Sequence, residues 1–159
     1  MTRPWMKSGA LVVLAVASLT ACSPKLPDGI DDTVLAESIG RQIGSGSTCV
    51  VIADAASGKL VWRGGGYVTC SRNLPTCDGV VTTAEKLLQA NLGKPARFFS
   101  CDSGSAPGNM VGWAIGPVPT SAGKPARNLT YVAVMEGERA LPGLEIKDRV
   151  EQAFEKAGF

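Results

Sequence analysis

The chain has 159 residues, with 16 Lys and Arg against 14 Asp and Glu, no histidine, five cysteines, 19 glycines and 10 prolines. This length suggests a single domain, and a small net charge with both signs interspersed argues against a nucleic-acid-binding surface. Because histidine is absent, histidine-based catalytic triads and dyads and histidine-ligated metal sites are excluded.

Residues 1–21 are predicted to be a secretory leader. Arg3 and Lys7 give it a positive start, and residues 11–19 form a short apolar run. That run is too short to span a hydrocarbon core as a helix, which needs about 20 residues. A charged start, a short apolar stretch and small residues after it are typical of a secretory signal. Because both leader charges are positive, the body that remains is close to neutral.

The leader ends in Leu19-Thr20-Ala21-Cys22, which resembles the lipobox of bacterial lipoprotein precursors. The resemblance implies cleavage before Cys22, attachment of diacylglycerol to its thiol and acylation of the new amino group. Multiple acyl chains hold a protein stably on a bilayer. Ser23 at the next position resembles the outer-membrane class of enterobacterial lipoproteins. An ordinary leader with a cysteine nearby is the alternative.

We therefore expect a chain of three parts in the bacterial cell envelope. Residues 1–21 are removed, residues 22–30 form a lipidated tether, and residues 31–159 form one globular domain. The acyl chains on Cys22 make the membrane one partner, and the periplasmic face of the outer membrane is the expected location.

The pattern of apolar residues predicts an α+β domain. Its expected elements are helix 31–43, strands 48–53 and 60–63, helix 82–92, strands 97–101, 110–115 and 129–135, and a last helix from about 142 to 157. Thr82 and Glu85 fit a capping box at the start of the second helix. The last helix carries one apolar stripe, formed by Ile146, Val150, Phe154 and Ala157.

The order α-β-β-α-β-β-β-α resembles that of profilin-like and roadblock/longin-like domains. The resemblance, which concerns element order only, implies a five-stranded antiparallel sheet with the terminal helices on one face. In the strand order 2-1-5-4-3 of those domains, the first strand is central. Four cysteines would then gather at one end of the sheet.

Those four cysteines, Cys49, Cys70, Cys77 and Cys101, are an even set in a chain expected to be exported. Two disulfides are the expected arrangement, because the periplasm is oxidising. A zinc site is the alternative, but such sites usually use closely spaced cysteine pairs, and no C-x-x-C redox pair is present. Four cysteines permit three pairings. We favour Cys70–Cys77 together with Cys49–Cys101.

Two sets of side chains are candidates for binding. The segment 93–97 recurs as 123–127, and the four cations of the two copies, which would suit an anion or an acidic partner, are Lys94, Arg97, Lys124 and Arg127. Both copies are also ordinary turns into strands. Trp62 and Tyr67 are candidate aromatic contacts, whereas Trp113 is expected in the core. Gly64, Gly65 and Gly66 lie between these aromatics, and we expect a flexible strand end there with no helix directly after it.

A catalytic site is not expected. Ser121 and Lys124 have the S-x-x-K spacing of Ser/Lys acyl enzymes, but the S-D-N and K-T-G motifs are absent. Asp54, Asp78 and Asp102 are scattered along the chain. We therefore expect no metal and no cofactor, and a non-catalytic binding or accessory module of an envelope complex with a protein partner. The alternatives are an inhibitor or immunity protein against a periplasmic hydrolase and, third, a Ser/Lys hydrolase.

Overall fold

A computed structural model describes residues 25–44 and 46–159. The leader, the lipobox and Cys22 lie outside the described residues. The helices are α1 (Asp32–Ile43), α2 (Tyr67–Ser71), α3 (Ala84–Ala90) and α4 (Gly143–Ala157). The strands are β1 (Thr48–Asp54), β2 (Leu60–Gly65), β3 (Leu74–Pro75), β4 (Val81–Thr82), β5 (Arg97–Asp102), β6 (Met110–Pro117) and β7 (Leu129–Gly137).

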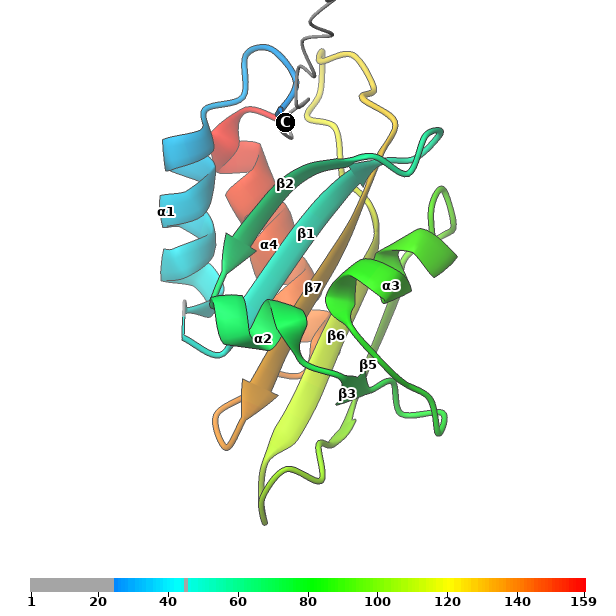
Figure 1. Ribbon diagram of the computed structural model, residues 1–159. Helices are drawn as coiled ribbons and strands as arrows, with labels where there is room; N and C mark the ends of the chain where they lie inside the picture. Colours follow the sequence, from blue (N-terminus) through cyan, green and yellow to red (C-terminus); the bar gives the residue numbers. More distant parts are fainter. Residues whose placement is uncertain (1–24, 45) are drawn as a thin grey trace, which may run out of the picture.

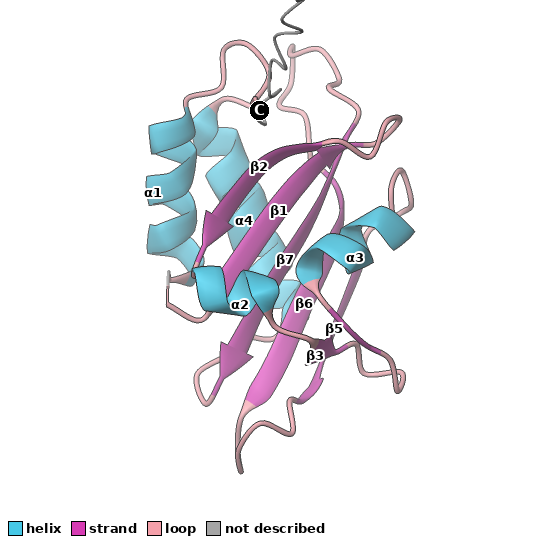
Figure 2. Ribbon diagram, viewed as in Figure 1, coloured by secondary structure: helices cyan, strands magenta, loops and turns pink. Residues whose placement is uncertain are grey.

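Five of the strands form one antiparallel sheet in the order β2-β1-β7-β6-β5, as Figure 1 shows. Helices α1 and α4 cover one face, and α2, α3 and the short β3–β4 hairpin lie on the other (Figure 2). The expected fold class, its strand order and the packing of both terminal helices on one face are confirmed.

The two terminal helices begin and end where the sequence indicated. Asp31 caps α1 by accepting a hydrogen bond from the Val34 amide, and Gly44 ends the helix. The apolar stripe of α4 is buried against the sheet. Gly143 starts α4 directly over the strands, where a Cβ would lie 2.4 Å from the Trp113 carbonyl oxygen. This close approach explains why a glycine opens the helix.

The expected capping box at the second helix is wrong by one residue. Helix α3 begins at Ala84, and the Thr83 hydroxyl accepts a hydrogen bond from the Lys86 amide at 3.3 Å. Thr82 instead belongs to β4 and pairs with Leu74 of β3. Glu85 therefore does not take part in capping, and its carboxylate lies 3.0 Å from Arg63 of β2. The cap is at Thr83 because Thr82 is part of the β3–β4 hairpin.

The expectation of no helix after the three glycines is also wrong. Gly65 has a φ of +97°, and a Cβ on it would lie 2.2 Å from the Thr48 carbonyl oxygen. The chain turns there and enters the five-residue helix α2. A helix this short has little intrinsic stability. Its attachment to β1 through a disulfide at Cys70 holds it on the sheet.

The expected disulfide pairing is wrong, although both disulfides are present. Cys49 pairs with Cys70, and Cys77 pairs with Cys101. Helix α2 carries Cys70 back over β1, and the β3–β4 hairpin carries Cys77 over β5, so neighbours in sequence are separated in space. Cys49 lies near the start of β1 and Cys101 near the end of β5, which places both bridges at one end of the sheet, as expected.

Candidate functional site

Strand β5 forms one edge of the sheet and leaves alternate backbone groups without a partner strand. The Ser103 amide donates to the Asn109 carbonyl oxygen at 2.8 Å, which fixes the hydrogen-bonding phase of the β5–β6 ladder. In this phase the amides and carbonyls of Phe98, Ser100 and Asp102 point away from β6. No backbone hydrogen bond from another described segment reaches them. The edge can therefore accept an additional strand.

Two phenylalanines place aromatic surface on both sides of this edge. Phe99 packs with Trp113 against the core under α3, with ring centroids 6.4 Å apart. Phe98 points to the opposite face and keeps 48% of its surface exposed. The guanidinium of Arg97 lies 5.8 Å from the centre of the Phe99 ring. An added strand would therefore contact the Phe98 ring on one face of the sheet and, on the other face, Arg97 lying over the Phe99 ring.

The β3–β4 hairpin forms one wall of a groove beside this edge. The groove has a volume of about 430 Å³ and is lined by Thr76, Cys77, Asp78, Arg97, Phe98 and Phe99. The Cys77–Cys101 disulfide fixes the hairpin to β5. The Trp113 indole nitrogen also donates to the Pro75 carbonyl oxygen at 2.8 Å. The groove is thus formed by covalently joined elements rather than by a free loop.

The charges in this groove leave the arginine available. Hydrogen bonds from the Thr76 hydroxyl and the Val80 amide lower the pKa of the Asp78 carboxyl, and Arg97 adds a smaller contribution. Arg97 forms no ion pair within 4.0 Å with any described residue. Its guanidinium can therefore meet a carboxylate supplied by a partner.

The opposite edge of the sheet is less regular. The register between β1 and β2 shifts between Ile52 and Ala53, and β2 ends in two glycines. Bulges and glycines interrupt the flat row of hydrogen-bonding groups that an added strand needs. The β5 edge is therefore the better candidate.

The four cations predicted from the repeated segment do not form one cluster. Arg97 lines the β5 groove, whereas Arg127 lines a separate hollow of about 270 Å³ that contains Gly93. Arg127 donates to the Asp28 carbonyl oxygen at 3.0 Å, and its guanidinium lies 5.9 Å from the Phe159 ring. Lys94 and Lys124 are both exposed. Only Arg97 belongs to the edge site.

The candidate aromatic residues differ in whether their side chains are exposed. Trp62 is buried, 6% exposed, and its indole nitrogen donates to Asp32 at 2.5 Å. Trp113 is fully buried, as expected. Tyr67 at the start of α2 is 78% exposed and is the aromatic of the three that is available for contact.

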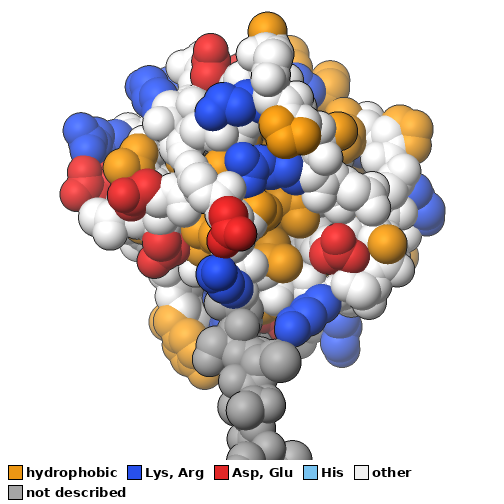
Figure 3. All heavy atoms as spheres, turned by 90° about the horizontal axis from the view of Figure 1, so that it is seen from above, with side chains coloured by type: hydrophobic (Ala, Val, Ile, Leu, Met, Phe, Trp, Pro, Cys, Tyr) orange, Lys and Arg blue, Asp and Glu red, His pale blue; other side chains and the backbone are white. Residues whose placement is uncertain are grey.

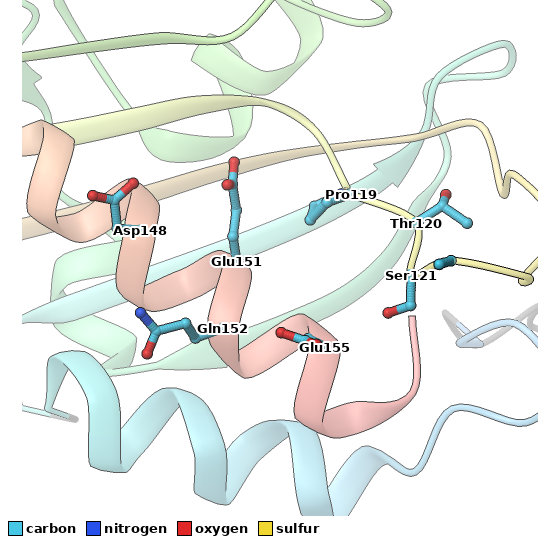
Figure 4. Close-up of a pocket in the computed structure, with 8 residues that line it drawn as sticks. Pro119, Thr120, Ser121, Asp148, Glu151, Gln152 and Glu155 are labelled. Atoms are coloured by element: carbon cyan, nitrogen blue, oxygen red, sulfur yellow. The ribbon is translucent and has the colours of Figure 1, made fainter.

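The S-x-x-K pair lies beside an acidic groove of about 490 Å³ between α4 and the segment 119–122. Figure 4 shows Ser121 across the groove from carboxylates of α4. The Ser121 hydroxyl donates to the Phe159 carbonyl oxygen, and the Lys124 amide donates to the Ser121 carbonyl. The observed contacts of this pair are those of a turn.

Two of the three carboxylates that line this groove, Asp148 and Glu151, are also engaged. Lys147 lies 2.8 Å from Glu151 and 3.6 Å from Asp148, and the hydrogen bond to Glu151 raises the pKa of the Lys147 ammonium. Burial raises the pKa of Tyr131, whose hydroxyl donates to Glu151 at 3.4 Å. Tyr131 therefore remains a protonated donor, and these interactions serve packing of α4 on β7.

A buried carboxylate at the far end of β7 joins three segments. Glu136 is 6% exposed, accepts from Arg72 at 2.7 Å and from Ser103 at 3.1 Å, and also accepts from Ser105. Burial by itself would raise the pKa of Glu136, but the two hydroxyls and Arg72 outweigh it and leave the pKa below the usual value. These hydrogen bonds therefore stabilise the ionised carboxylate of Glu136 in the folded protein.

Replacing Glu136→Gln should lower the free energy of unfolding at neutral pH by about 2 kcal/mol, because hydrogen bonds to a charged group are lost. The lowered pKa means that this stabilisation is present above the unfolded pKa of about 4.5 and is lost as the pH falls through the folded pKa. Urea unfolding at several pH values measures the effect. A wild-type advantage that does not shrink below pH 4.5 would contradict this role.

The described chain is a disulfide-linked α+β domain with one regular, open sheet edge. No protein-family model, curated protein or solved structure matches this chain. The resemblance to profilin-like and roadblock/longin-like domains thus remains one of element and strand order. Within residues 25–44 and 46–159, no helix is long and apolar enough to cross a membrane, and no group of three potential metal-binding side chains occurs.

Proposed function

We propose that this chain is a lipid-anchored lipoprotein of the bacterial cell envelope and works as a binding module without catalysis. The lipobox-like tetrad ending in Cys22 supports the anchor, and two disulfides in the domain suit an oxidising compartment. The partner is an envelope protein that adds an extended segment to the β5 edge.

The open hydrogen-bonding row of β5 is the observation that carries the binding assignment. Backbone groups of an added strand would pair with Phe98, Ser100 and Asp102, which gives affinity independent of sequence. Selectivity would come from the side chains beside the edge. An apolar residue of the partner would cover Phe98 and a carboxylate would meet Arg97.

Site-specific photocrosslinking in living cells tests this assignment. A photoreactive phenylalanine analogue at position 98 should yield one discrete adduct, whereas the same analogue at Val34 of α1, which is 40% exposed, should not. A second substitution, Asp102→Pro, removes an outward amide while leaving the crosslinking position unchanged, and it should abolish the adduct.

Two outcomes would contradict the edge assignment. One is an adduct of equal yield from position 34, and the other is an adduct at position 98 that persists in the Asp102→Pro variant. If the captured protein is a secreted hydrolase whose activity falls in the complex, the module acts as an inhibitor.

A further inference from the structure

The segment that leads from the anchor is packed onto the body rather than held away from it. Leu26 and Ile30 pack against the core shared by α1 and α4, and Arg127 holds the Asp28 carbonyl oxygen. In Figure 1 the described chain therefore enters at the end that also holds the segment 118–128 and the C-terminal residue. We call this end, with the turns 55–59 and 91–96, the upper end.

The upper end must lie close to any membrane that holds Cys22. Three peptide steps separate Cys22 from Lys25, and a fully extended chain covers at most ~11 Å in three steps. Because residues 26–30 are packed on the body, the domain cannot swing away on a long linker. The position of residue 25 thus fixes which end of the domain meets the lipid.

Exposed lysines gather at this end. They are Lys25, Lys59, Lys94, Lys124 and, near the end of α4, Lys156. All but Lys25 lie more than 4.0 Å from every carboxylate of the described residues. Figure 3 views the molecule from above and shows Lys and Arg side chains spread over this surface, interspersed with Asp and Glu.

Most carboxylates at the upper end already have partners within the chain. Asp28 lies 3.1 Å from Lys25, Asp31 caps α1, and Asp54 accepts hydrogen bonds from the Ser57 amide and hydroxyl. Asp28, Asp31 and Asp32 are nevertheless exposed, and Glu155 is exposed with no ion pair within 4.0 Å among the described residues. The lower end of the sheet has exposed carboxylates at Asp78, Asp102 and Glu138 and an exposed cation at Arg139, but it has no exposed lysine among the described residues. Four of the five described lysines that lack a carboxylate within 4.0 Å therefore lie at the upper end, namely Lys59, Lys94, Lys124 and Lys156.

We propose that the upper end rests on an anionic phospholipid surface, with its lysines contacting lipid phosphates. This inference depends on the lipid anchor proposed above. Basic residues next to a membrane anchor are attracted by the negative surface potential of anionic lipids. The domain then stands with its strands pointing away from the bilayer, and the lower end with both disulfides faces the periplasm.

Lysine labelling on vesicles tests this orientation. The full chain, processed in a bacterial host, is reconstituted into phosphatidylcholine vesicles with or without phosphatidylglycerol and treated with a membrane-impermeant amine reagent. Labelling of Lys59, Lys94 and Lys124 is compared with that of Lys86, which is exposed on α3. On anionic vesicles the three should be labelled severalfold more slowly than on neutral ones. In 1 M salt, where the Debye length is about 3 Å, this protection should disappear.

Variants and the N-terminal mass separate the two proposals. Lys94→Gln with Lys124→Gln should reduce protection of Lys59, whereas Lys86→Gln with Arg139→Gln should not. Equal labelling of Lys59 and Lys86 on anionic vesicles, with Cys22 lipidated, would overturn the orientation alone. An unmodified Cys22 would overturn the anchor and this inference with it.

Discussion

Replacing Cys49 and Cys70 together by alanine should lower the free energy of unfolding by about 3 kcal/mol or more. The bridge closes a loop with a sequence separation of 21, and a disulfide closing a loop of this size restricts the unfolded chain by about 3 kcal/mol. Both cysteines are also buried, 0% and 4% exposed, so their loss removes packing over β1. Urea denaturation under non-reducing conditions measures the change.

The second disulfide supplies the matched control. Cys77–Cys101 has a sequence separation of 24, so the same restriction of the unfolded chain is expected. Cys77 is exposed, however, and less packing is lost when both cysteines become alanine. The Cys49/Cys70 variant should therefore be the less stable of the two. Equal or greater destabilisation of the Cys77/Cys101 variant would contradict the claim that the more buried bridge contributes more to stability.

The substitution Cys22→Ser should move the protein from the membrane to the soluble periplasmic fraction. Serine has no thiol to accept diacylglycerol, so the acyl chains are lost. The remaining attraction of the upper-end lysines to anionic lipid is electrostatic and is removed by salt. Fractionation followed by extraction with salt and with detergent measures the distribution. The neighbouring substitution Ser23→Ala keeps the thiol and should leave the protein in the membrane fraction. Continued pelleting of the Cys22→Ser variant after salt extraction would contradict lipid anchoring.

Much of the fold could be predicted because its larger elements have strong periodicity. The apolar stripe from Ile146 to Ala157 is the buried face of α4. The apolar runs of β1 and β7 are buried along almost their whole length. The segment 66–83 lacks such periodicity. Helix α2 and the β3–β4 hairpin are short there and are held by disulfides, so their positions depend on pairings that spacing cannot determine.

The candidate site was harder to predict for a related reason. Arg97, Phe98 and Phe99 do not alternate between apolar and polar residues, so the sequence does not show which ring is buried. The open edge exists because β5 is last in the strand order, which is a property of the whole topology. Arg97 was predicted as a contact residue, but its repeat partner Arg127 holds Asp28 instead. The two copies of the repeated segment therefore have different roles: Arg97 lines the groove at β5, and Arg127 binds the segment before α1.

Amide hydrogen exchange at β5 tests most directly whether a partner strand pairs with this edge. In the free protein the amides of Phe98, Ser100 and Asp102 should exchange rapidly, and those of Phe99 and Cys101, which face β6, should be protected. With the protein captured through position 98, the three outward amides should become protected as well. If they continue to exchange rapidly while the complex persists, strand addition at β5 is contradicted.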